Sequence, residues 1–105
     1  MTLQIRDCRR AAQVRFRITK AEMLGPSRKY RVSRPRMIAM SLALELTGAS
    51  LGMVGKHFGG RDHTTVIHAR RKTAELSRAI PAFGEDVEHL RMVLTIYKAQ
   101  RQAYS

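Results

Sequence analysis

The sequence predicts an all-α fold, a small bundle of about six helices that contains a helix-turn-helix. Apolar residues recur with helical spacing along most of the 105 residues, and residues typical of helix starts and stops separate the segments. No segment alternates apolar and polar residues with the β-branched enrichment that is typical of a strand. A short helical segment, a Gly-Gly pair and a longer helical segment follow one another in the second half of the chain, which is the helix-turn-helix pattern.

The first two predicted helices lie near the N-terminus. Apolar residues between Leu3 and Phe16 are spaced for a short amphipathic helix with arginines on its other side. These apolar residues are Leu3, Ile5, Cys8, Ala11, Ala12, Val14 and Phe16. Thr19 and Glu22 form a capping-box pattern for a very short second helix, from Thr19 to Leu24, which Gly25-Pro26-Ser27 ends.

The third predicted helix runs roughly from Arg34 to Leu46, where apolar residues occupy most sides. Ser33 is a suitable N-cap for it, and Pro35 is tolerated in a first helical turn. A helix that is apolar on most sides is usually the buried centre of a bundle. We therefore expect this segment to form the middle of the core.

The fourth and fifth predicted helices form the helix-turn-helix. Ser50 starts the fourth helix, from Leu51 to Phe58, and Gly59-Gly60 ends it because glycine accepts the left-handed conformation of a helix stop. Asp62 is a good N-cap for the fifth helix, which runs to Leu76 or Ser77.

The sixth predicted helix spans about Glu85 to Gln102, after a connection over residues 81–84. Its inward-facing residues are expected to be Val87, Leu90, Val93 or Leu94, and Tyr97. No linker, internal repeat or low-complexity tract divides the sequence. We therefore expect residues 1–105 to form a single domain.

The charge of the chain indicates a polyanionic partner. The formal net charge is +12, of which residues 1–36 carry +9, residues 37–78 carry +3 and residues 79–105 carry none. A basic front and a neutral tail favour one binding face, and for a small basic domain the usual partner is nucleic acid. An anionic membrane surface, or a basic surface that serves only solubility, is the alternative.

Several classes of protein are excluded by what the sequence lacks. No apolar run is long enough to span a membrane, and the N-terminus has no secretory signal pattern. The single cysteine, Cys8, allows no internal disulfide, so we expect a reducing, cytosolic setting. No catalytic or metal-binding constellation is assembled, since His63 and His68 are five residues apart. We expect neither an enzyme nor a cofactor.

The residues at the start of the fifth predicted helix favour base recognition in DNA. In a helix-turn-helix the second helix enters the major groove by its N-terminal end, where this sequence has Arg61-Asp62-His63-Thr64-Thr65. Histidine and threonine have low helix propensity, but threonine offers a hydroxyl and a methyl to base edges, and an aspartate accepts from cytosine. The alternative is plain capping by Asp62, with Thr64 and Thr65 merely exposed.

The segment from Arg34 to Lys72 reads RPRMIAMSLALELTGASLGMVGKHFGGRDHTTVIHARRK. It closely resembles the C-terminal DNA-binding domain of the bacterial replication initiator family DnaA, and FGGRDHTTVIHA, from Phe58 to Ala69, matches the family signature almost letter for letter. Weaker resemblance covers Phe16 to Leu24 and Asp86 to Leu94. The resemblance implies sequence-specific binding of duplex DNA by one monomer, at short asymmetric boxes similar to TTATCCACA.

The same resemblance implies which residues contact DNA. Base contacts are expected from Asp62, His63 and Thr64 in the major groove, and from Arg28 in the minor groove of the A·T-rich half. An arginine suits that place also because narrow A·T minor grooves concentrate negative potential. Contacts to the DNA backbone are expected from Arg34, Arg36, Leu51, Arg61, Thr65, His68 and Lys72.

The sequence departs from the family pattern in several places. Met37 replaces a polar phosphate partner, Leu44 stands where a lysine is common, and Gly52 replaces a common proline. The loop from Gly25 to Arg31 is also less basic than is typical. We expect these changes to reduce phosphate contacts, and so affinity, more than to alter base choice.

The family's ATPase module does not accompany this domain in the sequence. Gly55-Lys56-His57 lacks the leading glycine and the following hydroxyl residue of a phosphate-binding loop, so ATP is not expected as a partner. We expect a nucleoid-associated cytoplasmic regulator of replication initiation or transcription, which is a stand-alone protein or, alternatively, an excised fragment. The alternatives are a nonspecific RNA-binding or ribosome-associated protein, and an interaction module that docks through its basic first helix.

Overall fold

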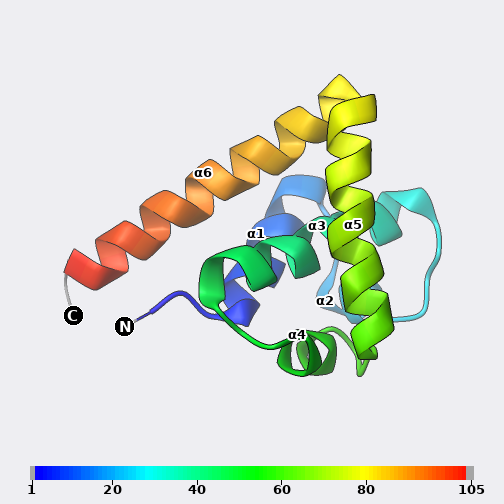
Figure 1. Ribbon diagram of the computed structural model, residues 1–105, viewed down its shortest axis with the longest axis horizontal. Coiled ribbons are helices and arrows are strands. Elements are labelled where there is room, and N and C mark those ends of the chain that lie inside the picture. Colours follow the sequence, from blue (N-terminus) through cyan, green and yellow to red (C-terminus); the bar gives the residue numbers. More distant parts are fainter. Residues whose placement is uncertain (1, 104–105) are drawn as a thin grey trace.

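The computed structural model describes residues 2–103, and within this range the chain forms six helices and no strand (Figure 1). The helices are α1 (Ile5–Phe16), α2 (Lys20–Leu24), α3 (Tyr30–Thr47), α4 (Leu51–His57), α5 (His63–Ala79) and α6 (Pro81–Ala103). The prediction of an all-α bundle of about six helices is therefore confirmed. None of these helices combines the length and the apolar character that crossing a membrane requires.

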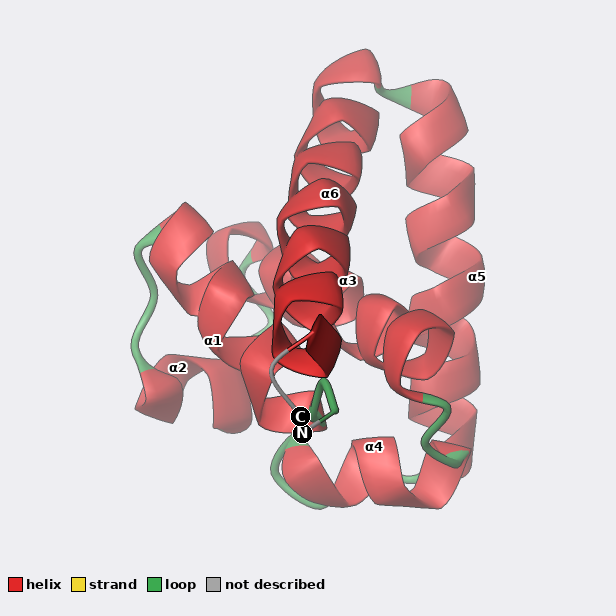
Figure 2. Cartoon of the chain, turned by 90° about the vertical axis from the view of Figure 1, so that its left-hand side faces the viewer, coloured by secondary structure: helices red, strands yellow, loops and turns green. Residues whose placement is uncertain are grey.

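α3 lies at the centre of the bundle and contacts each of the other five helices (Figures 1 and 2). It buries side chains on most of its circumference, which is why its sequence shows no polar face. Its buried apolar residues are Val32, Pro35, Ile38, Ala39, Met40, Leu42 and Ala43. The predicted role of this segment as the middle of the core is confirmed.

α3 begins four residues earlier than predicted, and Ser33 does not cap it. The helix starts after Lys29, whose carbonyl accepts the N–H groups of Val32 and Ser33 at 2.9 and 2.8 Å. Val32 is fully buried, and the free energy gained by removing its side chain from water stabilises the extra helical turn. Pro35 consequently lies in the second turn, where it cannot donate to the carbonyl of Arg31.

α6 also begins four residues earlier than predicted, because residues 81–84 are its first turn and not a connection. Pro81 occupies the first helical position, where proline loses no hydrogen bond and its fixed φ already suits a helix. Phe83 is buried in the core. Only Ile80 therefore links α5 to α6, and the two helices meet at a sharp corner (Figure 1).

Two side chains that the periodicity placed inward lie at the surface. Val14 on α1 is 80% exposed, and Tyr97 on α6 is 39% exposed with the guanidinium of Arg101 5.0 Å from its ring centre. Leu94 is buried on α6, whereas Val93 is not. Helical spacing identified the buried face of each helix but not the width of the strip that neighbouring helices cover.

Candidate nucleic-acid interface

α4 and α5 form the predicted helix-turn-helix, and glycine shapes the turn between them. Gly59 and Gly60 have φ values of 79° and 77°, the left-handed conformation that is strained in other residues. The carbonyl of Gly55 accepts the N–H of Arg61 at 2.9 Å, and a Cβ on Gly55 would clash with the backbone of Arg61. The turn thereby holds the start of α5 close against α4.

The first turn of α5 forms an exposed tip. The carboxylate of Asp62 accepts the N–H of Thr65 at 2.9 Å, and this hydrogen bond lowers the pKa of Asp62 below its usual range. His63, Thr64 and Thr65 are all exposed, whereas Val66 directly after them is buried. Capping by Asp62 is therefore present in the fold, and the side chains predicted to read bases lie on the surface beside it.

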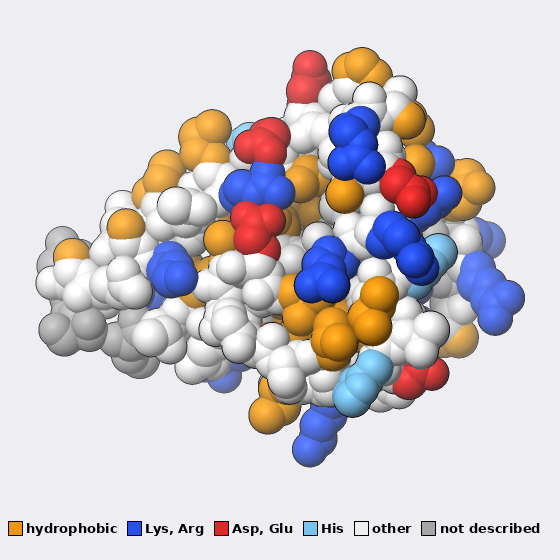
Figure 3. Space-filling view, viewed as in Figure 1, with side chains coloured by type: hydrophobic (Ala, Val, Ile, Leu, Met, Phe, Trp, Pro, Cys, Tyr) orange, Lys and Arg blue, Asp and Glu red, His pale blue; other side chains and the backbone are white. Residues whose placement is uncertain are grey.

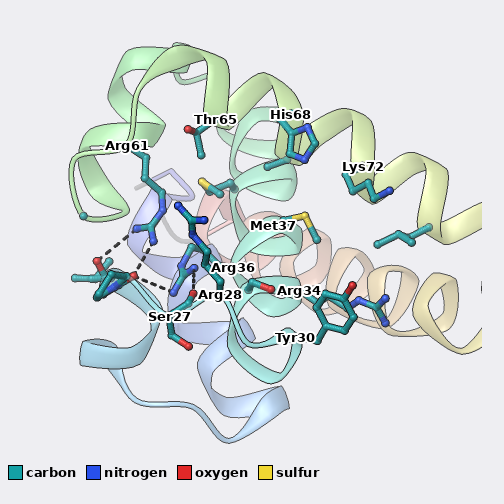
Figure 4. Close-up of a pocket in the computed structure, with 18 residues that line it drawn as sticks. Ser27, Arg28, Tyr30, Arg34, Arg36, Met37, Arg61, Thr65, His68 and Lys72 are labelled. Atoms are coloured by element: carbon teal, nitrogen blue, oxygen red, sulfur yellow. Dashed lines mark hydrogen bonds between the residues drawn. The ribbon is translucent and has the colours of Figure 1, made fainter.

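A groove of about 870 Å³ separates α5 from the loop that precedes α3 (Figure 4). Thr65, His68 and Lys72 line the α5 wall, and their spacing of three and four residues places them on one helix face. Arg28 and Tyr30 line the wall across from them. The structure thus brings Arg28, from the basic loop, to the same groove as the predicted DNA-backbone contacts Thr65, His68 and Lys72.

The loop side of the groove carries positive charge that the protein does not neutralise. Within residues 2–103, neither Arg28 nor Arg34 forms an ion pair. The guanidinium of Arg34 lies 4.3 Å from the ring centre of Tyr30, which is 71% exposed. In the space-filling view, Lys and Arg side chains are frequent over α5, while α6 shows more white and orange surface (Figure 3).

Besides Tyr30, Arg34 and Arg36, three further residues of α3 line this groove, and only Met37 among these three was singled out from the sequence. Ser33, Met37 and Met40 contribute to the side between its two walls. Their spacing of four and three residues puts them on one face of α3, and that spacing is the signal in the sequence that could have found them. Met37, the departure from the family pattern, therefore presents a thioether to the groove where a polar group is common.

Arg36 is buried, which was not expected of a residue predicted to contact phosphate; that contact stays a prediction. Its side chain is 5% exposed, and its N–H groups donate to four backbone carbonyls between α2 and the loop. These acceptors are the carbonyls of Glu22, Met23, Gly25 and Ser27, at 2.7 to 3.0 Å. Burial lowers the pKa of Arg36 to about 10, with a smaller contribution from nearby Arg61, so it stays charged at neutral pH. Arg36 holds the loop in place.

Arg61 is also hydrogen-bonded within the protein, and its predicted DNA-backbone contact stays a prediction. Its guanidinium donates to the carbonyls of Leu24 and Phe58, and to that of Gly25 at 2.7 Å. Burial lowers its pKa. Arg61 therefore joins the helix-turn-helix to the loop that carries Arg28, as the dashed lines in Figure 4 show.

The remaining predicted backbone contacts differ in position. Lys72 and His68 face the groove, whereas Leu51 lies at the start of α4, half-buried, behind the N-cap Ser50. The Ser50 hydroxyl accepts the N–H of Met53 at 3.1 Å, as its predicted capping role requires. A DNA contact by the Leu51 N–H stays a prediction.

Lys72→Ala is expected to weaken binding to all duplexes by the same factor. Lys72 lines the groove, so the substitution should remove its predicted phosphate contact and lower the slope of log affinity against log salt by about one. Titrations at several salt concentrations measure this slope. Arg78→Ala is the matched control, since Arg78 lies on α5 but outside the groove. An unchanged slope in Lys72→Ala would contradict the assignment.

Comparison with known proteins identifies the family. The family model described as "Bacterial dnaA protein helix-turn-helix" matches residues 9–73. The chain is 43% identical over 93 residues to proteins named "Chromosomal replication initiator protein DnaA" from Acinetobacter baylyi (strain ATCC 33305 / BD413 / ADP1) and from Acinetobacter baumannii (strains AYE and ACICU).

Each of these matches covers 89% of this chain but only 20% of the relative. The chain therefore spans about a fifth of the length of the relatives that it matches. The family model covers the loop, the central helix, α4, the turn and α5 as far as residue 73. The chain belongs to the family of bacterial DnaA helix-turn-helix domains, which bind DNA.

Proposed function

We propose that this domain binds double-stranded DNA at short, asymmetric sites similar to the DnaA box. The observation that carries the proposal is that Thr65, in the exposed first turn of α5, lines one groove with Arg28. Asp62, His63 and Thr64 are exposed beside it and line the adjoining depression. The first turn of a second helix in a helix-turn-helix is the part that meets base edges in the major groove. We assign base contacts there to Asp62, His63 and Thr64.

The groove between α5 and the loop suits one strand of DNA backbone. A major groove and the adjacent minor groove are separated by a single sugar–phosphate strand, so a protein that reads both must straddle that strand. Here the α5 tip serves the major groove and Arg28 the minor groove. Thr65, His68, Lys72 and Arg34 then contact the phosphates between them.

The biological role that we propose is regulation by occupancy. The relatives are named as replication initiators, and a domain with the same DNA reader competes for or shares their boxes. We infer that one monomer occupies each asymmetric box, that binding needs no ATP, and that the protein is associated with the nucleoid. The outcome is a change in replication initiation or in transcription near such boxes, through binding and not through catalysis.

Arg28→Ala is expected to weaken binding mainly to duplexes whose A·T-rich half is intact. A guanidinium in a narrow minor groove gains from the concentrated negative potential of A·T pairs, and alanine loses this gain. The difference in affinity between the A·T-rich duplex and one with G·C pairs in that half should shrink by about 1 kcal/mol or more. Competition binding with the two duplexes measures this difference.

Lys29→Ala is the matched control for Arg28→Ala. Lys29 carries the same charge in the same loop but does not line the groove. It is expected to lower affinity for both duplexes slightly and by the same factor. Equal losses of preference in the two variants would contradict a minor-groove role of Arg28.

The test of the proposed function is a direct comparison of nucleic acids at physiological salt. Fluorescence anisotropy is measured with a duplex that contains TTATCCACA, with a duplex in which the same base pairs are scrambled, and with double-stranded RNA of the box sequence. We expect tighter binding to the first duplex by a factor of roughly 10³ or more. Equal affinity for all three would favour the nonspecific, RNA-binding alternative.

A further inference from the structure

The tip of α5 meets α4 at a residue that has no side chain. Gly52 is the second residue of α4, and His63 is the first residue of α5. A Cβ on residue 52 would lie 2.7 Å from Nε2 of His63, and 3.5 and 3.7 Å from Cδ2 and Cε1 of the same ring. The imidazole therefore occupies the space that the side chain of any other residue at position 52 would need.

The surroundings of this contact belong to the surface that we propose reads DNA. Gly52 and His63 line a shallow depression together with Lys56, Asp62 and Thr64. Two other predicted base contacts thus border the same depression as the His63 ring. A movement of the His63 ring would therefore change the surface that we propose contacts the bases.

We propose that Gly52 is a specificity-determining residue that acts through His63, an inference that rests on the proposed function. Because residue 52 has no side chain, the imidazole of His63 lies against the start of α4, and this position of the ring sets which base edge it meets. A hydrogen bond to a base weakens steeply once its distance or angle leaves a narrow range. The size of residue 52 therefore controls base preference at the pair that His63 reads.

A larger residue at position 52 would displace side-chain atoms of His63 and no backbone atoms. Its effect on base preference can therefore be measured separately from any effect on folding. A Cβ–Nε2 distance of 2.7 Å is too short to persist, but Nε2 is the far end of a side chain that turns about two bonds. A methyl group at residue 52 moves the ring and leaves the helix backbone in place. Alanine is also the better helix former, and the substitution changes no charge.

The experiment compares Gly52→Ala, His63→Ala and the double variant with the unchanged chain. Affinities are measured on the duplex that the unchanged chain binds best and on duplexes with each single base pair replaced. Met53→Ala is the matched control, because Met53 is an exposed neighbour on α4 that does not line the depression. Thermal unfolding of every variant is followed in parallel.

We expect Gly52→Ala to change the preference at one or two base pairs by a factor of roughly five or more, at the pairs that His63→Ala also affects. The double variant should show the preferences of His63→Ala alone. Met53→Ala should leave all preferences unchanged, and the unfolding midpoint of Gly52→Ala should not fall.

Three results of the binding measurements would overturn the inference while the proposed function stands. They are an unchanged preference in Gly52→Ala, a change at base pairs that His63→Ala does not affect, and a further change when Gly52→Ala is added to His63→Ala. A lowered unfolding midpoint in Gly52→Ala would show that the backbone moves to accommodate the methyl group and the His63 ring does not. This result would also contradict the inference. An unchanged chain with no preferred duplex would instead remove the proposed function, and this inference with it.

Discussion

Arg36→Ala is expected to lower the free energy of unfolding by about 3–5 kcal/mol, a large effect for an arginine in so basic a chain. The substitution removes four hydrogen bonds and takes this donor from the carbonyls of Glu22, Met23 and Ser27, while the carbonyl of Gly25 keeps its hydrogen bond from Arg61. A buried carbonyl that has no hydrogen-bond donor destabilises the folded state, because it has lost its hydrogen bonds to water and gained none in return. The loop that carries Arg28 would lose its attachment to α3.

Denaturant unfolding followed by circular dichroism measures this effect. Arg36→Lys is an informative second variant, because a lysine keeps the charge but cannot reach four carbonyls in the fork geometry of a guanidinium. Arg34→Ala is the control, since Arg34 stacks on exposed Tyr30 and should change stability by less than about 1 kcal/mol. If Arg36→Ala kept its stability and only bound every duplex more weakly, the phosphate role inferred from sequence would be right after all.

Thr64→Ala is expected to cost about 1–3 kcal/mol of discrimination at one or two base pairs, with little change in stability. Thr64 is exposed in the first turn of α5, so its hydroxyl and methyl are free to meet base edges. Alanine keeps the helix but removes the hydroxyl and part of the apolar contact. The loss should therefore appear in the ranking of duplexes and not in the unfolding curve.

Thr65→Ala provides the matched control for this prediction. Thr65 is the neighbouring threonine and is also exposed, but it lines the groove in which we place the phosphate strand. Its replacement should weaken all duplexes by a common factor. Affinities for a set of single-base-pair variants distinguish the two outcomes, and identical rankings for both variants and the unchanged chain would contradict the assignment of Thr64 to base reading.

Features encoded by neighbouring residues could be predicted from the sequence. The capping box of Thr19 with Glu22 and the caps by Ser50 and Asp62 are present as predicted, because each joins residues only a few positions apart. The turn at Gly59-Gly60 follows from the conformational freedom of glycine alone. The location of the helix-turn-helix is therefore encoded locally.

Features that depend on the packed fold could not be predicted in this way. The early starts of α3 and α6 follow from burial of Val32 and Phe83, which local boundary residues do not report. From the sequence, Arg36 and Arg61 were predicted to be surface cations. In the structure, each donates to at least one carbonyl that lies more than ten residues away in the sequence. Only the folded path of the loop brings those carbonyls together.

The same distinction explains which site residues sequence reasoning placed well. His63, Thr64 and Thr65 lie on the surface because they precede Val66, the first buried residue of α5. The position of Arg28 opposite that helix depends on Arg36 and Arg61, which hold the intervening loop. Two arginines that the resemblance assigns to DNA thus support the arginine that we propose enters it.

The central claim is that the α5 tip and Arg28 together read a defined sequence, and an unbiased selection tests it most directly. Bound duplexes are selected from a random pool at physiological salt and then sequenced. The account predicts enrichment of one asymmetric box with an A·T-rich half, similar to TTATCCACA. Recovery of duplexes with no shared sequence would contradict it.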